Sequence, residues 1–373
     1  MKRWIIALLP VLMFAACTKE GNTIIEFDPD EPKASTAPLV TVIYNADALG
    51  DRSYNDLIYK GVEEAVAKYR LRSMQMSPTS YEEGMAYLQT MFQTVSATKA
   101  DTIRRLYIVC AAGYDDYIRQ NAHLFAENPN ADLLYMETPD PLPEGCGSTL
   151  YLPYYGAMYE AGAIAPYIKS QQLIIASNPV DETVAGAVSG FSDGFNTDYY
   201  NLHWSYETKQ LDTLYLASGA GQGYNIPDST AMQIFNDSKY MTASFIPICG
   251  GAASKFYYLA NILVRYYIGV DVDNANYYCN LSAVKHIERA VQLCIAQWLS
   301  PEGMPRHQVL GLESGYTEAI VHLRSLWSDD DFKQYIPDSL RQKIHEDAIR
   351  KENASLTPNP SPVREGNLNG EGI

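Results

Sequence analysis

The chain has 373 residues, 47% of them hydrophobic, and a formal net charge of −16. This length is enough for a large buried core and predicts two globular units, since domains usually hold about 100–200 residues. The excess of acidic side chains argues against nucleic acid as a partner, because proteins bind phosphate backbones with clustered Lys and Arg.

The amino-terminal segment has the composition of an export signal. Lys2 and Arg3 precede an apolar run over 4–14, and small residues follow directly before Cys17. A membrane-spanning helix needs about 20 apolar residues, so this run is too short for a permanent span. We therefore expect a secretory signal.

The end of this segment is similar to the processing site of bacterial lipoproteins, in which the cysteine is lipidated and becomes the new amino terminus. Phe14 fits that pattern loosely, and an ordinary cleaved signal is the alternative. We expect a signal peptide over 1–16, lipidation of Cys17 and a polar tether over 17–38. The protein would then lie in the cell envelope, outside the cytoplasm, with a lipid anchor in a membrane.

From residue 39 onward, strand-like apolar segments alternate with amphipathic helices. The first expected strands lie over 39–45, 105–113 and 131–139, and the first helices over 54–70 and 114–127. Strands that alternate with helices in this way predict βαβ units and a parallel sheet.

A second series of the same kind follows, which predicts a second sheet. Its expected helices lie near 156–168, 185–200, 228–237 and 254–265, and its strands over 171–177, 212–218, 241–251 and 266–273. Beyond the second series we expect a peripheral amphipathic helix over 329–350. The tail over 351–373 has Pro, Asn and Gly and few apolar residues, so we expect it to be disordered.

The helix that follows the first strand begins with a capping box. Ser53 and Asp56 fit the pattern [ST]-x-x-[DE] that closes a helix amino terminus. This spacing places Tyr54 and Asn55 in the first helical turn, at the carboxyl end of a strand. Ligands of open α/β sheets bind at that end, so ligand contact is one interpretation and a packing tyrosine is the other.

A further helix is expected over 282–299, with Ser282 as its cap. Lys285 would then lie in the first turn, where the helix dipole disfavours a cation by about 0.3–1 kcal/mol. A nearby carboxylate such as Asp271, or a polar ligand between the two, would compensate. A solvated lysine is the alternative.

Two short motifs resemble catalytic signatures. GFSDG, over 190–194, matches the G-x-S-x-G elbow of α/β-hydrolases, with Ser192 as the nucleophile. That elbow needs a strong strand directly before the serine, whereas the preceding residues indicate a helix. GAGQG, over 219–223, lacks the full spacing of a phosphate-binding loop and is more typical of a turn.

Five cysteines follow Cys17. Cys110 and Cys294 occur in apolar patterns that are typical of buried thiols. No Cys or His spacing indicates a metal site, and we expect neither a metal nor a cofactor.

Six stretches, in order and together, resemble the basic membrane protein family, the nucleoside-binding lipoproteins of ABC transporters. They are GDRSYND (50–56), AAGYDDYIRQNAHLFAENPNADLLYME (111–137), YYGAMYEAGAIAPYIKS (154–170), VSGFSDGFN (188–196), PICGGAASKFYYLA (247–260) and IGVDVDNANYYCNLSAVKHIERAV (268–291). Each stretch alone is a weak signal, and the ordered set is specific.

The resemblance implies the type I periplasmic binding fold. In that fold two Rossmann-like α/β lobes with parallel sheets are joined by a hinge of three crossovers, and the ligand lies between them. The first lobe would cover 39–152 with 278–302, and the second 153–277 with 303–328. Cys146 and Cys279 would lie near crossovers, where a disulfide between them is a hypothesis.

The resemblance also implies ligand contacts by position. Asp51 and Asn55 would contact the edge of the base. Tyr54 stands where the family has a stacking Phe, and Tyr257 would occupy the second aromatic position.

The remaining implied contacts concern the sugar and the backbone. Asp271 would bind ribose hydroxyls, with Lys285 beside it, and Asp273 would be a turn residue. Gly113 and Gly251 would let the backbone approach the ligand. The sequence departs from the family pattern at AASK (252–255) and at Asn274, two places that the resemblance puts close to the pocket.

The function implied by the resemblance is binding without catalysis. A lipid-anchored, monomeric protein would capture a nucleoside, such as a purine nucleoside, and present it to an ABC permease. A sensor or scavenger of another small ligand, such as a sugar, is the alternative with the same fold, and a serine hydrolase built on Ser192 is the alternative of another class.

Overall fold

The computed structural model describes residues 36–46, 48–110, 113–197, 199, 208–276, 278–322 and 336–356. The expected signal peptide, Cys17 and nearly all of the tether lie outside the described residues. From Pro38 on, the chain forms one compact unit. Within the described ranges, no helix is both long and apolar enough to cross a lipid bilayer.

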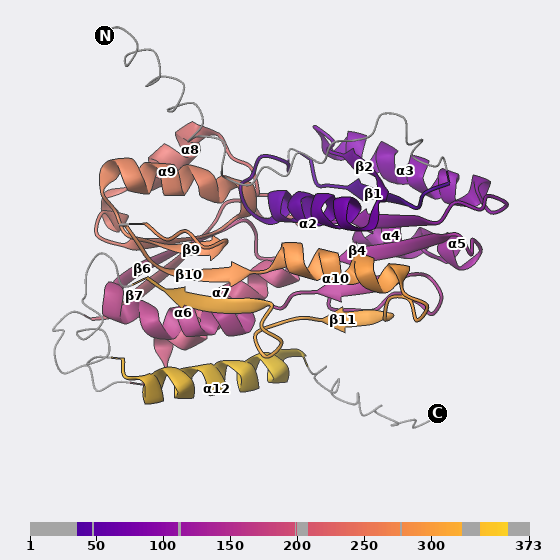
Figure 1. Ribbon diagram of the computed structural model, residues 1–373. Coiled ribbons are helices and arrows are strands. Elements are labelled where there is room, and N and C mark those ends of the chain that lie inside the picture. The colour runs from indigo at the N-terminus through magenta and orange to yellow at the C-terminus, as the bar shows by residue number, and fades with distance from the viewer. Residues whose placement is uncertain are drawn as a thin grey trace, which may run out of the picture. The chain divides into compact units, whose positions relative to one another are not determined.

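The first lobe is a six-stranded sheet with helices on both faces (Figure 1). Its strands are β1 (Leu39–Ile43), β2 (Arg72–Met76), β3 (Arg105–Val109), β4 (Ala131–Met136), β5 (Ser148–Tyr151) and β11 (His307–Val309). Its helices are α2 (Tyr54–Tyr69), α3 (Tyr81–Ala97), α4 (Asp115–Asn121), α5 (His123–Ala126) and α10 (Ile287–Leu299). The strand order is β11-β5-β4-β3-β1-β2, and every neighbouring pair is parallel.

The second lobe repeats this plan. Its strands are β6 (Gln171–Ala176), β7 (Gln210–Tyr215), β8 (Ser244–Ile248), β9 (Tyr267–Asp271), β10 (Cys279–Lys285) and β12 (Thr317–Val321). Its helices are α6 (Tyr155–Ile168), α7 (Glu182–Asn196), α8 (Asp228–Phe235), α9 (Ala253–Leu263) and α12 (Asp338–Leu356). The order is β12-β10-β9-β8-β6-β7, in which only the edge strand β12 is antiparallel to its neighbour.

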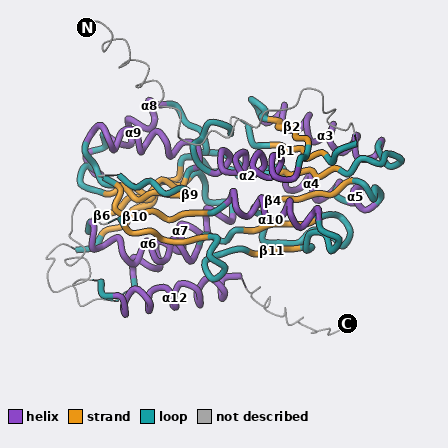
Figure 2. Tube along the Cα trace, in the orientation of Figure 1, coloured by secondary structure: helices purple, strands orange, loops and turns teal. Residues whose placement is uncertain are grey.

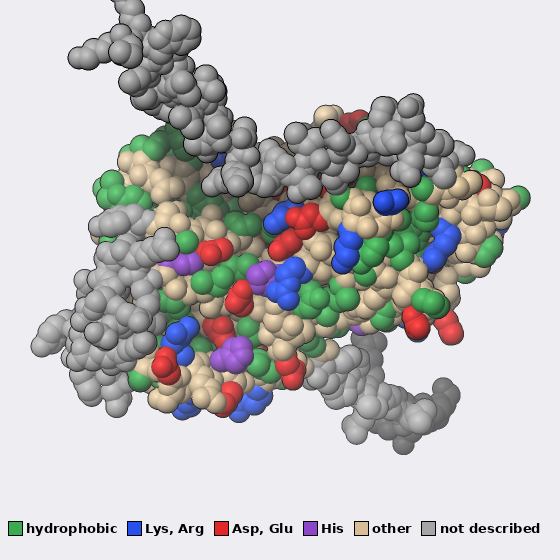
Figure 3. Space-filling view, in the orientation of Figure 1, with side chains coloured by type: hydrophobic (Ala, Val, Ile, Leu, Met, Phe, Trp, Pro, Cys, Tyr) green, Lys and Arg blue, Asp and Glu red, His purple; other side chains and the backbone are tan. Residues whose placement is uncertain are grey.

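Each sheet buries both of its faces, as Figure 2 shows by the position of the strands between helices. In β3, Leu106 and Ile108 pack under α2 and α10, whereas Tyr107 and Val109 pack under α3 and α5. Strands covered on both sides read as continuous apolar runs, which is why the sequence pattern could reveal them. On the outer surface, the face drawn in Figure 3 interleaves acidic, basic and apolar side chains.

The chain passes between the lobes three times, at 152–154, at His286 and at 310–316. Backbone hydrogen bonds tie the third crossover to the end of β5 and to the second crossover. Leu310 N–H donates to Tyr151 O at 2.9 Å, and His286 N–H donates to Tyr316 O at 2.8 Å. The predicted fold class, two parallel α/β lobes with a triple crossover, is confirmed.

The predicted lobe boundaries differ from the sheets at two strands. β10 pairs with β9 and belongs to the second sheet, although 278–285 was assigned to the first lobe. β11 pairs with β5 and belongs to the first sheet, although 303–309 was assigned to the second. The second crossover therefore lies at His286, and the third follows Val309.

The predicted helix over 282–299 is wrong at its start. Ser282 lies inside β10, where its hydroxyl accepts the N–H of Asn274 at 3.1 Å, and Lys285 is the last residue of that strand. Helix α10 begins at Ile287. β10 is buried along its whole length between two neighbouring strands. This tertiary context outweighs the local pattern that predicted a helix from residue 282 on.

The carboxyl-terminal prediction also needs correction. Helix α12 spans Asp338–Leu356, so it continues past residue 350 into the segment expected to be disordered. The residues over 329–335 and 357–373 lie outside the described ranges. α12 buries Ile344, Ala348 and Glu352.

The disulfide hypothesis is wrong. Cys146 and Cys279 are both free thiols, and they lie in separate apolar clusters of the first and second lobe. Cys110 and Cys294 are buried free thiols, as predicted.

The G-x-S-x-G motif is a helix-packing motif. Ser192 lies within α7, and no strand directly precedes it. A Cβ on Gly190 would lie 2.2 Å from Tyr155 O, and one on Gly194 would lie 2.0 Å from Tyr159 O. The two glycines therefore let α7 pack closely against α6. GAGQG, in turn, forms a turn with positive φ at Gly221 and Gly223.

Candidate functional site

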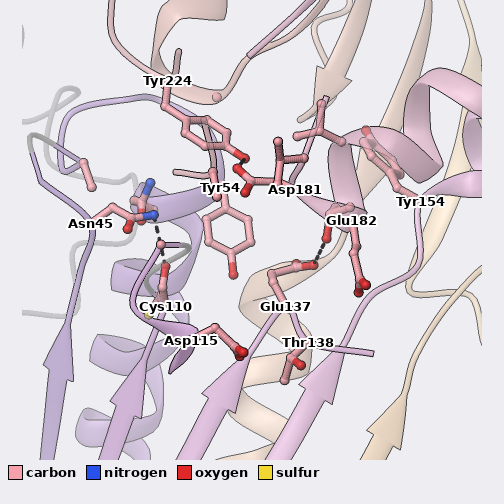
Figure 4. Close-up of a pocket in the computed structure, with 18 of the residues that line it drawn as sticks. Asn45, Tyr54, Cys110, Asp115, Glu137, Thr138, Tyr154, Asp181, Glu182 and Tyr224 are labelled. Carbon is pink, nitrogen blue, oxygen red and sulfur yellow. Dashed lines mark hydrogen bonds between the residues drawn. The ribbon is translucent and has the colours of Figure 1, made fainter. Parts of the chain in front are cut away.

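A cavity of about 430 Å³ lies between the two lobes. Its walls come from the segments that follow the carboxyl ends of β1, β3, β4, β6, β8 and β9, which is where open α/β sheets bind ligands. Figure 4 shows Tyr54, Tyr154 and Tyr224 around this space, with Asp181 beside Tyr224 and with Glu137 and Asp115 below Tyr54. The volume is in the usual range for small-molecule sites, about 300–1,000 Å³.

The structure brings together nearly all of the candidate ligand residues. Those that line the cavity are Asp51, Tyr54, Asn55, Gly113, Gly251, Asp271 and Lys285. Tyr257 does not line it, because its hydroxyl accepts the N–H of Val270 at 2.8 Å and its ring packs on Tyr267. Asp273 also lies outside the cavity and pairs with His322 at 2.8 Å.

Asp51 closes the amino terminus of α2. Its carboxylate accepts the backbone N–H groups of Ser53, Asn55 and Asp56 at 2.8, 2.9 and 3.2 Å. It also accepts the Asn55 side-chain amide at 2.9 Å. Asp51 therefore performs the capping that the sequence pattern assigned to Ser53.

Two polar atoms in the first turn of α2 remain available for a ligand. The Tyr54 hydroxyl and Asn55 Oδ1 are buried and have no hydrogen-bond partner among the described residues. Figure 4 shows the Tyr54 ring extending into the cavity between Tyr224 and Glu137. Buried polar atoms normally find partners, so unpaired ones beside a cavity indicate where a bound molecule would supply them.

Asp271 links the two lobes at the tip of β9. Its Oδ2 accepts the hydroxyl of Ser53, from the first lobe, at 2.9 Å. Its backbone has a positive φ of 66°, and its N–H donates to the Tyr154 hydroxyl at 2.8 Å. Burial raises the pKa of the Asp271 carboxyl, and the nearby Lys285 ammonium opposes that rise.

Lys285 is almost fully buried at the end of β10. Its ammonium donates to Glu137 Oε1 at 3.2 Å and lies 4.8 Å from the ring centre of Tyr154 and 5.9 Å from that of Tyr54. Lys285 lies near Asp271, as predicted, but it is the last residue of a strand and not part of a helix.

Glu137 is a central site residue that sequence reasoning missed. It follows β4 with a positive φ of 60°, a conformation that is strained for a side chain other than glycine. Besides Lys285, its carboxylate accepts the hydroxyl of Thr183, on α7 of the second lobe, at 2.9 Å. Its position directly after an apolar strand, at the end where open α/β sheets bind ligands, was the available signal.

A second group of missed residues occupies the wall near α4 and α7. The Asp115 carboxylate accepts Arg119 Nε at 2.8 and 3.0 Å. Asp181 accepts the Tyr224 hydroxyl at 2.8 Å and Gly221 N–H at 3.1 Å. These partners fix the orientation of both carboxylates.

The cavity wall carries far more negative than positive groups. Its cations are Arg119 and Lys285, and its carboxylates are Asp51, Asp115, Asp116, Glu137, Asp140, Asp181, Glu182 and Asp271. Burial together with Asp140 and Asp115 raises the pKa of Glu182. Such a lining disfavours anionic ligands. In the described part of the chain, no cluster of His, Cys, Asp and Glu could hold a metal ion.

Gly113 and Gly251 let the lobes approach each other. Gly113 has a φ of 90°, which favours glycine. A Cβ on Gly251 would lie 3.3 Å from both Asp51 Cβ and Tyr224 O. Together with the Ser53–Asp271 and Thr183–Glu137 bonds, these contacts define a closed arrangement around the cavity.

Comparison with solved structures supports the fold. A solute-binding protein of an ABC transporter system from Aeropyrum pernix K1 is similar with a TM-score of 0.58 at 15% identity, over 85% of this chain and 86% of that one. A transcriptional activator of the comK gene from Bacillus halodurans has a TM-score of 0.58 at 13% identity, over 86% and 100% of the two chains. A solute-binding protein from Conexibacter woesei has a TM-score of 0.55 at 12% identity, over 86% and 97%.

No protein-family model matches the chain, and no curated protein matches it in sequence. The solved neighbours thus define the class of fold, the type I periplasmic binding fold. At these identities the likeness concerns the fold alone.

Proposed function

We propose that this chain is a solute-binding protein of the cell envelope that closes its lobes on a purine nucleoside. The observation that carries the proposal is the interlobe cavity, whose wall holds the unpaired Tyr54 and Asn55 atoms together with the half-buried Asp271 carboxylate. One side of the cavity would hold the base and the other the ribose.

The base would bind at the first turn of α2. Stacking on the Tyr54 ring contributes about 1–3 kcal/mol, by analogy with bases on aromatic side chains. Asn55 Oδ1 would accept an N–H from the base edge, since its own amide donates to Asp51. The second aromatic ring beside the base, expected from Tyr257, would come from Tyr224 or Tyr154, both of which line the cavity.

The ribose would bind between Asp271 and the Glu137–Lys285 pair. A carboxylate that accepts two hydroxyls contributes about 1.5–3 kcal/mol for each bond. With one stacked ring, two such bonds bring the sum to about 4–9 kcal/mol, and the upper part of this range corresponds to micromolar affinity, near −8 kcal/mol.

The charge of the lining favours a neutral ligand over a phosphorylated one. With eight carboxylates and two cations on the wall, a phosphate group would meet net repulsion. Nucleosides are therefore better candidates than nucleotides. A neutral sugar also satisfies this condition, which keeps the sugar-binding alternative with the same fold.

The cellular role follows from the amino-terminal pattern. A signal peptide over 1–16 and lipidation at Cys17 would anchor the protein outside the cytoplasm, where a monomer would hand its ligand to an ABC permease. Binding is favoured over catalysis because Ser192 lies within helix α7, between two glycines that pack against α6, and not on the strand-to-helix turn that a nucleophile elbow needs.

A thermal-shift panel tests the proposal. Adenosine at about 100 times its dissociation constant stabilises the folded state by about 2.7 kcal/mol and raises Tm by several degrees. Adenine, ribose and adenosine monophosphate should each shift Tm less than adenosine, and Asn55→Ala should reduce the adenosine shift. A shift with free sugars and none with any nucleoside would replace the proposal by the sugar alternative.

A further inference from the structure

The carboxylate of Glu352, near the end of α12, joins the start of α6 to the third crossover. Its Oε2 accepts the N–H of Gly156, in the first turn of α6 just after the first crossover, at 2.6 Å. Its Oε1 accepts the N–H of Leu312, inside the third crossover, at 2.8 Å. Glu352 is 2% exposed, so water does not compete for these bonds.

Two glycines make room for this carboxylate. A Cβ on Gly156 would lie 2.7 Å from Glu352 Oε2, and a Cβ on Gly311 would lie 2.3 Å from Oε1. Neither glycine has a positive φ, so lack of space and not backbone conformation disfavours a side chain. Besides the carboxylate, Leu312 Cβ would lie 3.0 Å from a Cβ on Gly156, and Pro153 Cγ 2.7 Å from one on Gly311. The pocket that holds the Glu352 carboxylate is therefore built from α6, the third crossover and α12, which are far apart in the chain.

α12 is fixed to the second lobe. It lies along α6 in Figure 1, where Ala348 packs with Tyr159 and Leu312. His345 Nδ1 lies 2.5 Å from the buried Glu160 Oε1 of α6, which adds a polar link. Glu352 therefore holds Leu312 to the second lobe.

The consequence concerns where the hinge bends. β11, which ends at Val309, moves with the first lobe, whereas Leu312 is held by α12. Within the third crossover, a rotation of the lobes must then be taken up in the two residues between these points, Leu310 and Gly311. A crossover restricted to so few bending positions permits a smaller range of lobe openings than a free loop over 310–316.

We propose that α12 is a hinge clamp, in which Glu352 fixes the third crossover and limits how far the two lobes open. Glu352 is a positioning residue, since it lies outside the ligand cavity. The inference rests on the proposed function only in that lobe closure serves ligand capture.

The test measures the distance between the lobes in the full chain by double electron–electron resonance. Nitroxides are attached to Glu82→Cys, on α3, and Ser229→Cys, on α8, which are both exposed, in a Cys17→Ser background. The other five cysteines are buried. All measurements are made without any added small molecule.

Glu352→Ala should broaden the distance distribution and shift its mean to longer distance. Glu352→Gln keeps one acceptor and should give a smaller shift, and it decides the question if the Ala variant does not fold. Glu346→Ala removes the same charge from the exposed face of α12 and should leave the distribution unchanged.

A lower Tm for Glu352→Ala with unchanged distances, or an unchanged Glu352→Gln distribution where the Ala variant does not fold, would overturn the clamp and leave Glu352 a stabilising residue only. A failure of adenosine to bind would count against the proposed nucleoside but would not affect these distances. The two failures are therefore distinguishable.

Discussion

Asp51, Tyr54 and Asn55 show how one helix turn can serve both the fold and the site. Asp51 satisfies three backbone N–H groups at the start of α2, and this fixes the direction in which Tyr54 and Asn55 point. The sequence pattern located this turn correctly. It could not distinguish which of two neighbouring oxygens caps the helix, because Ser53 turns away to a partner 218 residues further along the chain.

The pKa of Asp271 gives a prediction about pH. Burial raises this pKa in the folded state above its unfolded value, so the folded protein binds more protons between the two values. The Asp271 contribution to stability therefore falls as pH rises from about 4 through the folded-state pKa. Replacing Asp271 with Asn removes this term.

Urea unfolding of wild type and Asp271→Asn at pH 4, 5, 6 and 7 measures the effect. The variant should gain stability relative to wild type as pH rises. Asp273→Asn, which changes a half-exposed carboxyl of the same turn outside the cavity, is the matched control. A difference between wild type and Asp271→Asn that does not change with pH would contradict the assignment.

At the scale of elements, the closest packing in the second lobe is between α6 and α7. Gly194→Ala should lower stability by about 1–3 kcal/mol, since its Cβ would lie 2.0 Å from Tyr159 O and the helices would have to separate. Gly186→Ala lies on the same helix with nothing within 4 Å of the new Cβ, and should raise stability by about 0.4–1 kcal/mol.

Thermal unfolding of both variants checks this pair. Equal effects of the two substitutions would mean that helix propensity alone, and not the close approach of α6, decides the role of the glycines. The same experiment tests the packing interpretation of the G-x-S-x-G motif.

Sequence patterns identified elements in which the spacing of apolar residues alone shows which side chains are buried. β3 and β8 are continuous apolar runs that are buried along their length, and α2 buries Ile58, Val62 and Ala65 at helical spacing. β10 was not predicted because its sequence, CNLSAVK, contains small and polar residues. These residues form a strand through their pairing with β9 and β12. The end of α12 was predicted wrongly because Glu352, a charged residue, is buried by partners that lie 40 and 196 residues away in the chain.

At the scale of the whole molecule, the site depends on contacts that no local pattern contains. Glu137 meets Lys285 across 148 residues and Thr183 across 46. The resemblance to a family placed seven candidate residues on the cavity wall, but it misplaced Tyr257 and gave no indication of Glu137, Tyr154 or Tyr224. Their place on the cavity wall depends on contacts between the two folded lobes, so it could be recognised only from the structure.

The central claim is that Asp271 binds the sugar of a nucleoside in the interlobe cavity. Calorimetry of wild type, Asp271→Ala and Asp273→Ala with adenosine and adenine tests it most directly. Removing the Asp271 carboxylate takes away charge-assisted bonds and leaves ligand hydroxyls unpaired, which costs about 2–5 kcal/mol, or about 30-fold to several thousand-fold in affinity.

We expect wild type to bind adenosine much more tightly than adenine, and Asp271→Ala to bind the two almost equally. Asp273→Ala should remain close to wild type, because its carboxylate pairs with His322 outside the cavity. Equal binding of adenosine and adenine by wild type, or a larger loss in Asp273→Ala than in Asp271→Ala, would contradict the account.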